Sequence, residues 1–259
     1  EKTITILHTN DTHSQIFPIA ADKGRWAGFG GYAKRAYLID GIRAEGRGVL
    51  LFDSGDFSQG TPYFNFFKGN IEVDAMGLMG YDAVTLGNHE FDNGVEELAR
   101  RVDRAEFPVL SANYDFSGSA MEGKTLPFKL FDVKGVKVGA FGLTINTRGM
   151  VDAANARGAV YKDPVACAQW AADTLRALGA DVVVALTHLG EHSTPFYIGD
   201  DSLAAKTSGI DLILGGHSHT DGISTVRNKE GGEVTIVQQA SQGRLLGRVD
   251  ITVKKKKKE

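Results

Sequence analysis

The stretch that decides the fold is YDAVTLGNHEFDNG, from Tyr81 to Gly94. It begins as a short apolar run with β-branched residues, which is typical of a buried strand. The run stops at Gly87, and polar side chains then follow closely: Asn88, His89, Glu90 and Asp92. This stretch therefore predicts a buried strand whose carboxyl end presents several polar groups at one point.

The same arrangement recurs along the chain. TITILH is followed by TNDTHS, VLLF by DSGDFSQG, AVTL by GNHEFD, VVVAL by THLG, and DLIL by GGHSHT. KVGAFGL is a further apolar run, and residues 233–253 have the pattern of consecutive strands. Helical patterns lie between several of these runs, within residues 32–39, 95–102 and 165–175. Strands that alternate with amphipathic helices predict an α/β layered fold.

Composition limits the classes of function. The chain has 259 residues, 42% of them hydrophobic and 24% charged, as expected of one large or two small globular domains. A formal net charge of -3 gives no general attraction to nucleic acid, and we expect no nucleic-acid partner. No apolar run is long enough for a transmembrane segment. Cys167 is the only cysteine, which excludes an internal disulfide and a cysteine-based metal site.

Side chains able to bind a metal follow five of the predicted strands. They are Asp11, His13, Asp56, Asn88, His188, His217 and His219. Ligands of α/β sheets bind beyond the carboxyl ends of the strands, so we expect these side chains to converge. In extended backbone, residues two positions apart point to the same side, as expected for Asp11 with His13 and for His217 with His219. Each residue alone is also typical of a turn or a core, but their combination predicts a metal site.

The order DTH, GD, GNHE, THLG and GGHSH resembles the signature of the calcineurin-like metallophosphoesterases. ILHTNDTHS, LGNHEFD and LSANY resemble more narrowly the N-terminal catalytic domain of the 5′-nucleotidase and UDP-sugar hydrolase family. The resemblance implies a four-layer α/β/β/α sandwich of mixed sheets over residues 1–253, with metals at the carboxyl ends of the strands. Residues 254–259 then form a lysine-rich tail. The family's C-terminal specificity domain has no match here. The chain is then a fragment, a natural single-domain phosphatase, or a subunit that acts with a separate specificity domain of another chain.

The resemblance also implies the ligands of two metal ions. Asp11, His13, Asp56 and His219 would hold one ion, and Asp56, Asn88, His188 and His217 the other, with Asp56 as the bridge. Four imidazoles among the ligands suit two divalent transition metal ions, such as Mn, Zn, Co or Fe, better than Mg.

Two further residues of GNHEFD have roles implied by the resemblance. His89 would stabilise the transition state or protonate the leaving oxygen, and Asp92 would orient His89. Asp92 or Asn93 is also a candidate cap for the helix that begins near Val95. We expect Asn88 and His89 to contact substrate.

Four other polar residues near these motifs have weaker indications. Asn113 of SANY is expected to contact substrate or to brace the site from behind. Glu90 is expected to make a structural contact or to face water, and His8, on a strand face shared with apolar residues, to lie in the core. The pattern around His192 decides nothing.

The predicted function is a dinuclear metal-dependent phosphoesterase in which a metal-activated water attacks phosphorus. The expected small-molecule substrates are 5′-nucleotides or related phosphate esters. Alternatives on the same scaffold are a 2′,3′-cyclic phosphodiesterase, a UDP-sugar pyrophosphatase or a sulfur-ester hydrolase. A non-catalytic metal-bound module is the alternative from another class, although the presence of His89 and Asp92 favours turnover. The first residue, Glu1, indicates either a processed, exported chain or a trimmed piece, and we expect a periplasmic or extracellular location.

Overall fold

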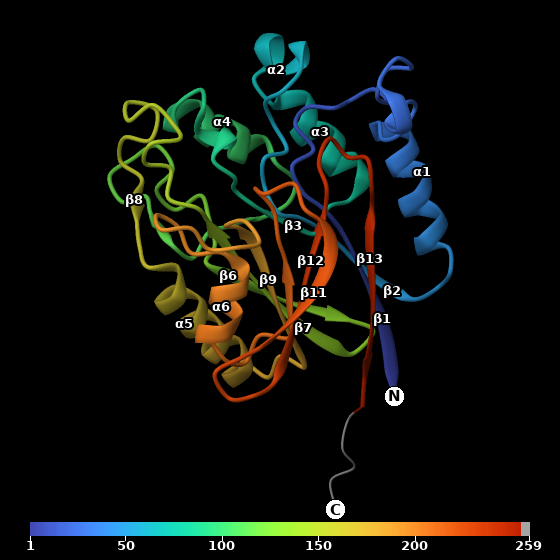
Figure 1. Cartoon of the computed structure of the whole chain (residues 1–259), viewed down its shortest axis with the longest axis vertical. Helices are drawn as coiled ribbons and strands as arrows, with labels where there is room; N and C mark the ends of the chain where they lie inside the picture. The colour runs from blue at the N-terminus through green and yellow to red at the C-terminus, as the bar shows by residue number, and fades with distance from the viewer. Residues whose placement is uncertain (255–259) are drawn as a thin grey trace, which may run out of the picture.

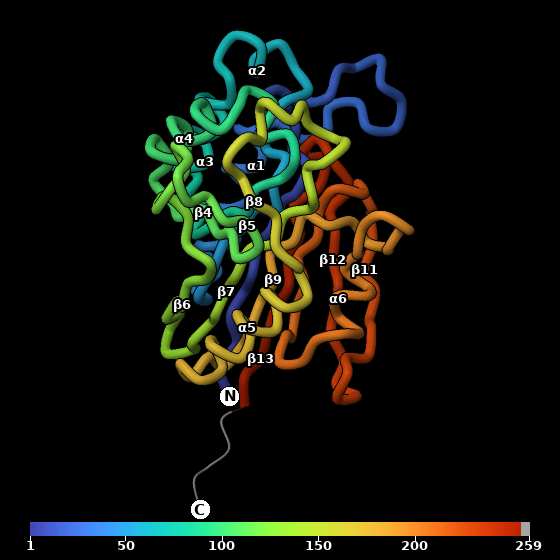
Figure 2. The backbone as a smooth tube through the Cα atoms, turned by 90° about the vertical axis from the view of Figure 1, so that its left-hand side faces the viewer, coloured from blue at the N-terminus to red at the C-terminus, as the bar shows by residue number. Residues whose placement is uncertain are grey.

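The computed structural model describes residues 1–254. Two β-sheets face each other in its centre, and helices cover the outer face of each sheet (Figure 1). The view turned by 90° shows the strands running along the long axis, with loops gathered at the end opposite the two termini (Figure 2). The predicted α/β/β/α sandwich of mixed sheets is therefore confirmed. Apart from Lys254, the predicted lysine-rich tail lies outside the described residues.

The first sheet has the strand order β13-β1-β2-β3-β4. Its strands are β1 (Lys2–Thr9), β2 (Gly48–Asp53), β3 (Ala83–Thr85), β4 (Val109–Leu110) and β13 (Gly247–Val253). β1 to β4 are parallel, whereas β13 pairs with β1 in the antiparallel direction. The carboxyl ends of the four parallel strands consequently meet at one edge of the sheet.

The second sheet has the order β11-β12-β10-β9-β7-β6. Its strands are β6 (Phe128–Val133), β7 (Val136–Thr144), β9 (Val182–His188), β10 (Leu212–Leu214), β11 (Asp221–Arg227) and β12 (Glu233–Gln239). The four central strands are parallel, and β6 and β11 close the two edges in the antiparallel direction. A small separate sheet joins β5 (Tyr114–Asp115) to β8 (Val160–Tyr161).

Helices bury apolar side chains against the outer faces of both sheets. α1 (Tyr32–Arg43), α3 (Asn70–Met79) and α4 (Val95–Arg104) cover the first sheet, whereas the short α2 (Pro62–Phe67) buries Phe64 and leaves Phe66 and Phe67 exposed. α5 (Pro164–Ala177) and α6 (Asp200–Lys206) cover the second. Along β1, Leu7 faces the core under α1, α3 and α4, whereas Ile6 faces the core between the two sheets. Successive side chains of β1 point to opposite faces of the sheet and therefore pack in two different cores.

The predicted strands and the three predicted helices are all present as such elements. The stretch 233–253 does form two strands, β12 and β13, but they belong to different sheets. Within residues 1–254 no helix has the length and apolar character needed to cross a bilayer.

Candidate metal centre

The predicted ligands come from both sheets. Asp11 and His13 follow β1, Asp56 follows β2 and Asn88 follows β3, all in the first sheet. His188 is the last residue of β9, and His217 and His219 follow β10, in the second sheet. All these strands end on the same side of the sandwich, so the site lies where the two sheets meet at one end (Figure 1).

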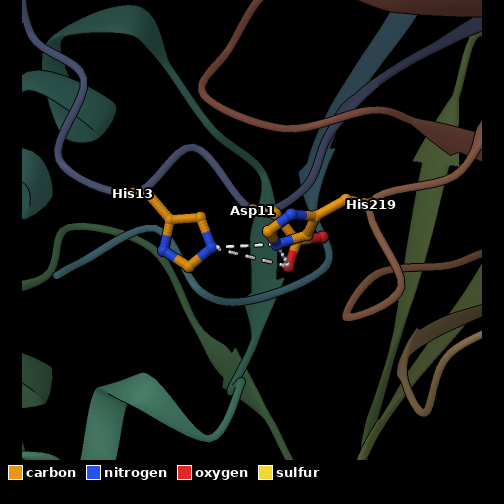
Figure 3. A group of neighbouring side chains, drawn as sticks. All are labelled: Asp11, His13 and His219. Atoms are coloured by element: carbon orange, nitrogen blue, oxygen red, sulfur yellow. Dashed lines mark hydrogen bonds and ion pairs between the residues drawn. The ribbon is translucent and has the colours of Figure 1, made fainter. Parts of the chain in front are cut away.

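Asp11, His13 and His219 form a first group of ligand atoms within 4.8 Å of one another (Figure 3). The two Nε2 atoms of the histidines are 3.1 Å apart. Nε2 of His219 lies 3.3 Å from Oδ1 of Asp11, and Nε2 of His13 lies 3.9 Å from the same oxygen. Three side chains from two sheets therefore direct one donor atom each at a common point.

Asp56, His188 and His217 form a second group of the same kind. Nε2 of His188 lies 3.1 Å from Oδ2 of Asp56, and Nδ1 of His217 lies 3.0 Å from Oδ1 of Asn88. The His188 and His217 rings stand edge to face, with centroids 5.2 Å apart. The predicted fourth ligand of this group, Asn88, is thus in place.

The two groups adjoin at Asp56. Its Oδ2 lies 4.0 Å from Nε2 of His13, which belongs to the first group, and Oδ1 of Asp11 lies 3.9 Å from Nε2 of His188, which belongs to the second. Dinuclear hydrolytic sites hold two ions about 3.5–4 Å apart. Asp56 therefore lies within 4.0 Å of a histidine from each group.

Backbone carbonyls fix the orientation of two of the imidazoles. Nδ1 of His188 lies 2.8 Å from the carbonyl oxygen of Ser54, and Nδ1 of His13 lies 3.1 Å from that of Gln59. A carbonyl oxygen can only accept, so each Nδ1 carries a proton and Nε2 is the ring nitrogen that faces the carboxylates. A proton or a cation has to lie between such an Nε2 and a carboxylate oxygen, and imidazole with carboxylate is a donor set that suits divalent transition metals.

The pKa values reflect the same concentration of charge. Burial alone would lower the pKa of His188, but the carboxylates of Asp56 and Asp11 outweigh it and raise that pKa well above its usual value. Burial would raise the pKa of Asp56, but His188 and His13 hold it well below its usual range. Burial, together with the nearby His188, lowers the pKa of His217 to about 4. In this arrangement a cation can replace the proton that the carboxylates attract.

The backbone of the ligand loops differs from the expectation of extended pairs. Five of the seven predicted ligands have φ between 48° and 77°, a region that non-glycine residues rarely adopt: Asp11, His13, Asp56, His217 and His219. His217 and His219 do not share a side, because their rings join different groups. Loop hydrogen bonds hold these conformations, including Asp11 N–H to Gly55 O and His13 N–H to Asp56 O, at 2.9 and 3.0 Å.

His89 and Asp92 lie beside the two groups as a bonded pair. Nδ1 of His89 donates to Oδ2 of Asp92 over 2.7 Å, and the His89 ring centroid is 5.5 Å from that of His13. The bond to Asp92 raises the pKa of His89 to about 9, against the effect of burial and with help from Asp56. α4 begins at Val95, and its N-cap is Gly94. No side chain caps the helix, so neither Asp92 nor Asn93 has this role.

Asn113 is set back from the metal-binding groups. It is fully buried, its Nδ2 donates to the carbonyl of Thr144 over 2.8 Å, and its Oδ1 accepts from Thr144 N–H over 2.9 Å. Both amide atoms are therefore occupied, and this geometry supports a bracing role rather than contact with substrate.

Besides His89, two histidines lie outside the two ligand groups. His8 is a buried core residue, as predicted, and burial lowers its pKa to about 3. The His192 side chain is 75% exposed and pairs with Asp201.

Two residues beside the ligands have contacts that the sequence does not reveal. Asn10 donates to Oδ2 of Asp11 over 2.6 Å and to Ala240 O over 2.9 Å, and so ties a ligand to the loop after β12. Glu90 is fully buried and accepts from the backbone of both the Asp56 loop and Gly87, which confirms its structural contact. The only signal in the sequence is the position of each next to or near a ligand.

Comparisons with known proteins agree with this geometry. The model of the calcineurin-like phosphoesterase family matches residues 4–221. The chain is 37% identical to the snake venom 5′-nucleotidase of Crotalus adamanteus over 96% of its own length and 45% of that protein.

Solved structures are also similar. The chain matches the 5′-nucleotidase precursor of Thermus thermophilus with a TM-score of 0.89 and 36% identity, over 96% of this chain and 51% of that one. It matches the NAD nucleotidase of Haemophilus influenzae with a TM-score of 0.84 and 26% identity, over 96% of this chain and 47% of that one. The chain spans about half the length of these relatives. With its fold, its ligand geometry and these matches in agreement, the chain belongs to the calcineurin-like phosphoesterase family.

Proposed function

We propose that this chain is the catalytic part of a dinuclear metal-dependent phosphoesterase that hydrolyses 5′-nucleotides or related phosphate esters. The observation that carries the proposal is the meeting of two ligand groups at Asp56, with the His89–Asp92 pair beside them. Relatives named 5′-nucleotidase support the substrate class.

The proposed ligands follow the two groups. Asp11, His13, Asp56 and His219 would hold one ion, and Asp56, Asn88, His188 and His217 would hold the other. The donor set favours Mn, Zn, Co or Fe. When bound, the two ions supply positive charge for the phosphoryl oxygens and lower the pKa of the attacking water.

The chain's own residues supply the acid. His89 is protonated at neutral pH because Asp92 raises its pKa, and Nδ1 is engaged with Asp92, so Nε2 is the nitrogen that can face substrate. As the oxygen of water bonds to phosphorus and the P–O ester bond breaks, Nε2–H gives its proton to the leaving oxygen, and the water releases a proton to solvent, from which His89 is protonated again. Asp92 keeps the ring oriented and stabilises its charge. The amide of Asn88 lies at the same edge and can contact a phosphoryl oxygen.

The proposal also covers the choice of substrate and the cellular location of the protein. The relatives are about twice as long as this chain, and we assign nucleotide specificity to a further domain or subunit that acts with it. The names of a venom enzyme and of a precursor favour a periplasmic or extracellular location.

Metal removal and reconstitution test the proposal. The protein is stripped with a chelator, reloaded with Mn, Zn or Co, and assayed on AMP, a 2′,3′-cyclic nucleotide, UDP-glucose and a simple aryl phosphate. Release of phosphate from AMP that depends on metal supports the proposal. Two bound ions without turnover on any of these esters would contradict it and indicate a binding module.

Cleavage of a nucleotide pyrophosphate bond is a second candidate activity, favoured by the resemblance to the NAD nucleotidase. The same two ions and the same acid would serve it, because only the leaving group changes. Assays on NAD and UDP-glucose that detect release of the mononucleotide distinguish this activity from attack on a terminal phosphate.

A further inference from the structure

We propose that Glu90 is a positioning residue that holds Asp56 and Asn88 at the separation needed for two metal ions. This inference rests on the proposed function, since it concerns the same site. Glu90 binds no substrate and is not itself a proposed ligand, and its side chain is fully buried behind the ligand loops.

The carboxylate of Glu90 joins two loops that come from different strands. Oε2 accepts from Asp56 N–H over 2.8 Å and from Gly87 N–H over 2.6 Å. Oε1 accepts from the backbone N–H of Ser58 over 3.1 Å and from its hydroxyl over 2.9 Å. Each oxygen therefore receives two donors, and the four bonds tie the loop after β2 to the turn after β3.

The connection between the two loops is reciprocal. While Glu90 accepts from the N–H of Asp56, Oδ1 of Asp56 accepts from His89 N–H over 2.9 Å. This bond occupies Oδ1 and leaves Oδ2 to face His188 at 3.1 Å. The backbone of Asp56 also has a φ of 54°, a region that residues other than glycine adopt uncommonly. The bond from Glu90 thus fixes the backbone of Asp56, while the bond from His89 N–H decides which of its oxygens faces His188.

Arg101 of α4 supports this connection from behind. It is 1% exposed, and its guanidinium donates to the carbonyl oxygen of Glu90, to Lys68 O over 3.1 Å and to the Ser58 hydroxyl over 3.3 Å. A buried carboxylate is tolerated when it is hydrogen-bonded and has a counter-charge nearby. Glu90 has both, since four donors reach its two oxygens and the charge of Arg101 lies nearby.

Glutamine cannot reproduce this arrangement although it has the same shape. A carboxamide has one acceptor oxygen and one NH2 group. Either orientation of glutamine would place the NH2 group against a backbone N–H from which it cannot accept: those of Asp56 and Gly87 at one oxygen, or that of Ser58 at the other. Glu90→Gln should therefore separate the two loops while changing neither volume nor any proposed ligand.

The test is titration of metal-free protein with Mn²⁺, followed by calorimetry and electron paramagnetic resonance. We expect Glu90→Gln to weaken Mn²⁺ binding by about 10- to 100-fold, the usual effect of residues that orient ligands. At saturating Mn²⁺ we expect loss of the exchange-coupled signal of the ion pair. Glu97→Gln is the matched control, because Glu97 pairs with Arg100 on the same helix as Arg101 and contacts neither loop. Wild-type affinity and an unchanged coupled signal in Glu90→Gln would overturn the proposal.

A second variant covers the case in which Glu90→Gln does not fold, as judged by circular dichroism. Ser58→Ala removes one of the four donors, together with the hydrogen bond from Arg101 to this hydroxyl, and leaves the charge and the three backbone bonds to Glu90 in place. We expect it to weaken Mn²⁺ binding by about 2- to 10-fold, because the loop after β2 loses one of its bonds to Glu90. Unchanged affinity in Ser58→Ala would then overturn the proposal. Failure of the wild-type protein to bind two Mn²⁺ ions would instead contradict the proposed function.

Discussion

Nδ1 of His89 donates a hydrogen bond to Oδ2 of Asp92 over 2.7 Å, across the single turn that follows β3. The pair lies at the edge of the ligand groups, and its ring is only about a third exposed. A histidine held in this way is already oriented and already charged before substrate arrives. The pair can therefore be tested separately from the ligands beside it.

Replacement of His89 should affect turnover and not metal content. We expect His89→Ala to reduce kcat by about 10²–10⁴ on an ester with a poor leaving group, because the acid is lost. Metal analysis of the same samples should give the wild-type amount of bound ion. Unchanged kcat on the poor leaving group would remove His89 from the mechanism.

Replacement of Asp92 should change the pH dependence. Its bond to the ring raises the pKa of His89 to about 9, so the charged ring persists at neutral pH and is lost as the pH rises through about 9. In Asp92→Asn, burial still lowers the pKa of His89 and only more distant charges oppose it, so this pKa should fall. NMR titration of the metal-free protein measures this shift, and the alkaline limb of kcat should move to lower pH in the loaded enzyme. An identical titration in both proteins would show that Asp92 does not control His89.

The raised pKa also contributes to stability, with a definite sign. Because folding favours the protonated ring, this contribution is complete below the usual pKa of about 6.5 and disappears as the pH rises through about 9. The difference in free energy of unfolding between wild type and Asp92→Asn should therefore shrink between these two pH values. A difference that stayed constant across this range in chemical denaturation would contradict the assignment.

The proposed bridge predicts a loss of metal. Asp56→Asn removes the negative charge from the point where the two groups meet, so both ions should bind more weakly. Metal analysis after dialysis should find less than the wild-type content. Full occupancy of both sites in this variant would argue against a shared carboxylate.

Gly87 should tolerate no side chain. A Cβ at this position would overlap Oδ1 of Asp56, which packs directly against the glycine. We expect Gly87→Ala to cost about 1–3 kcal/mol of stability and to displace Asp56, with weaker metal binding as a result.

Gly41→Ala is the matched control for the glycine variant. Gly41 lies within α1, where a Cβ would meet no atom within 4 Å, so alanine there should raise stability by about 0.5–1 kcal/mol. Thermal unfolding of the two variants makes the comparison. Equal stabilities would contradict the proposed contact at Gly87.

Much of this fold could be predicted because its central strands are continuously apolar. β9 is buried along its whole length, and so is β3, and both stand out in the sequence. β11 does not stand out in the sequence, because it lies at a sheet edge and none of its residues is buried. β6 is also an edge strand, mostly half-buried, and its pattern is similarly weak.

The division into two sheets is not visible in periodicity, since parallel strands of either sheet read alike. The candidate ligands could be predicted because each is a distinctive residue type at a strand end. The bonds of Glu90 could not, because its donors are backbone groups of loops about 30 residues away in sequence, such as Asp56 N–H. The left-handed backbone of the ligand loops was equally hidden, because aspartate and histidine at those positions predict no particular φ.

Because the ligands are divided between the two sheets, bound cations would also link the sheets at the end of the sandwich where the ligands lie. Asp11 and Asp56 would bind the ions from the first sheet, and His188 and His219 from the second. An ion that binds only the folded chain adds about 2.7 kcal/mol of stability at a free concentration 100 times its Kd. Bound ions would thus stabilise the fold as well as serve the reaction, and metal-free protein should unfold more readily than metal-loaded protein.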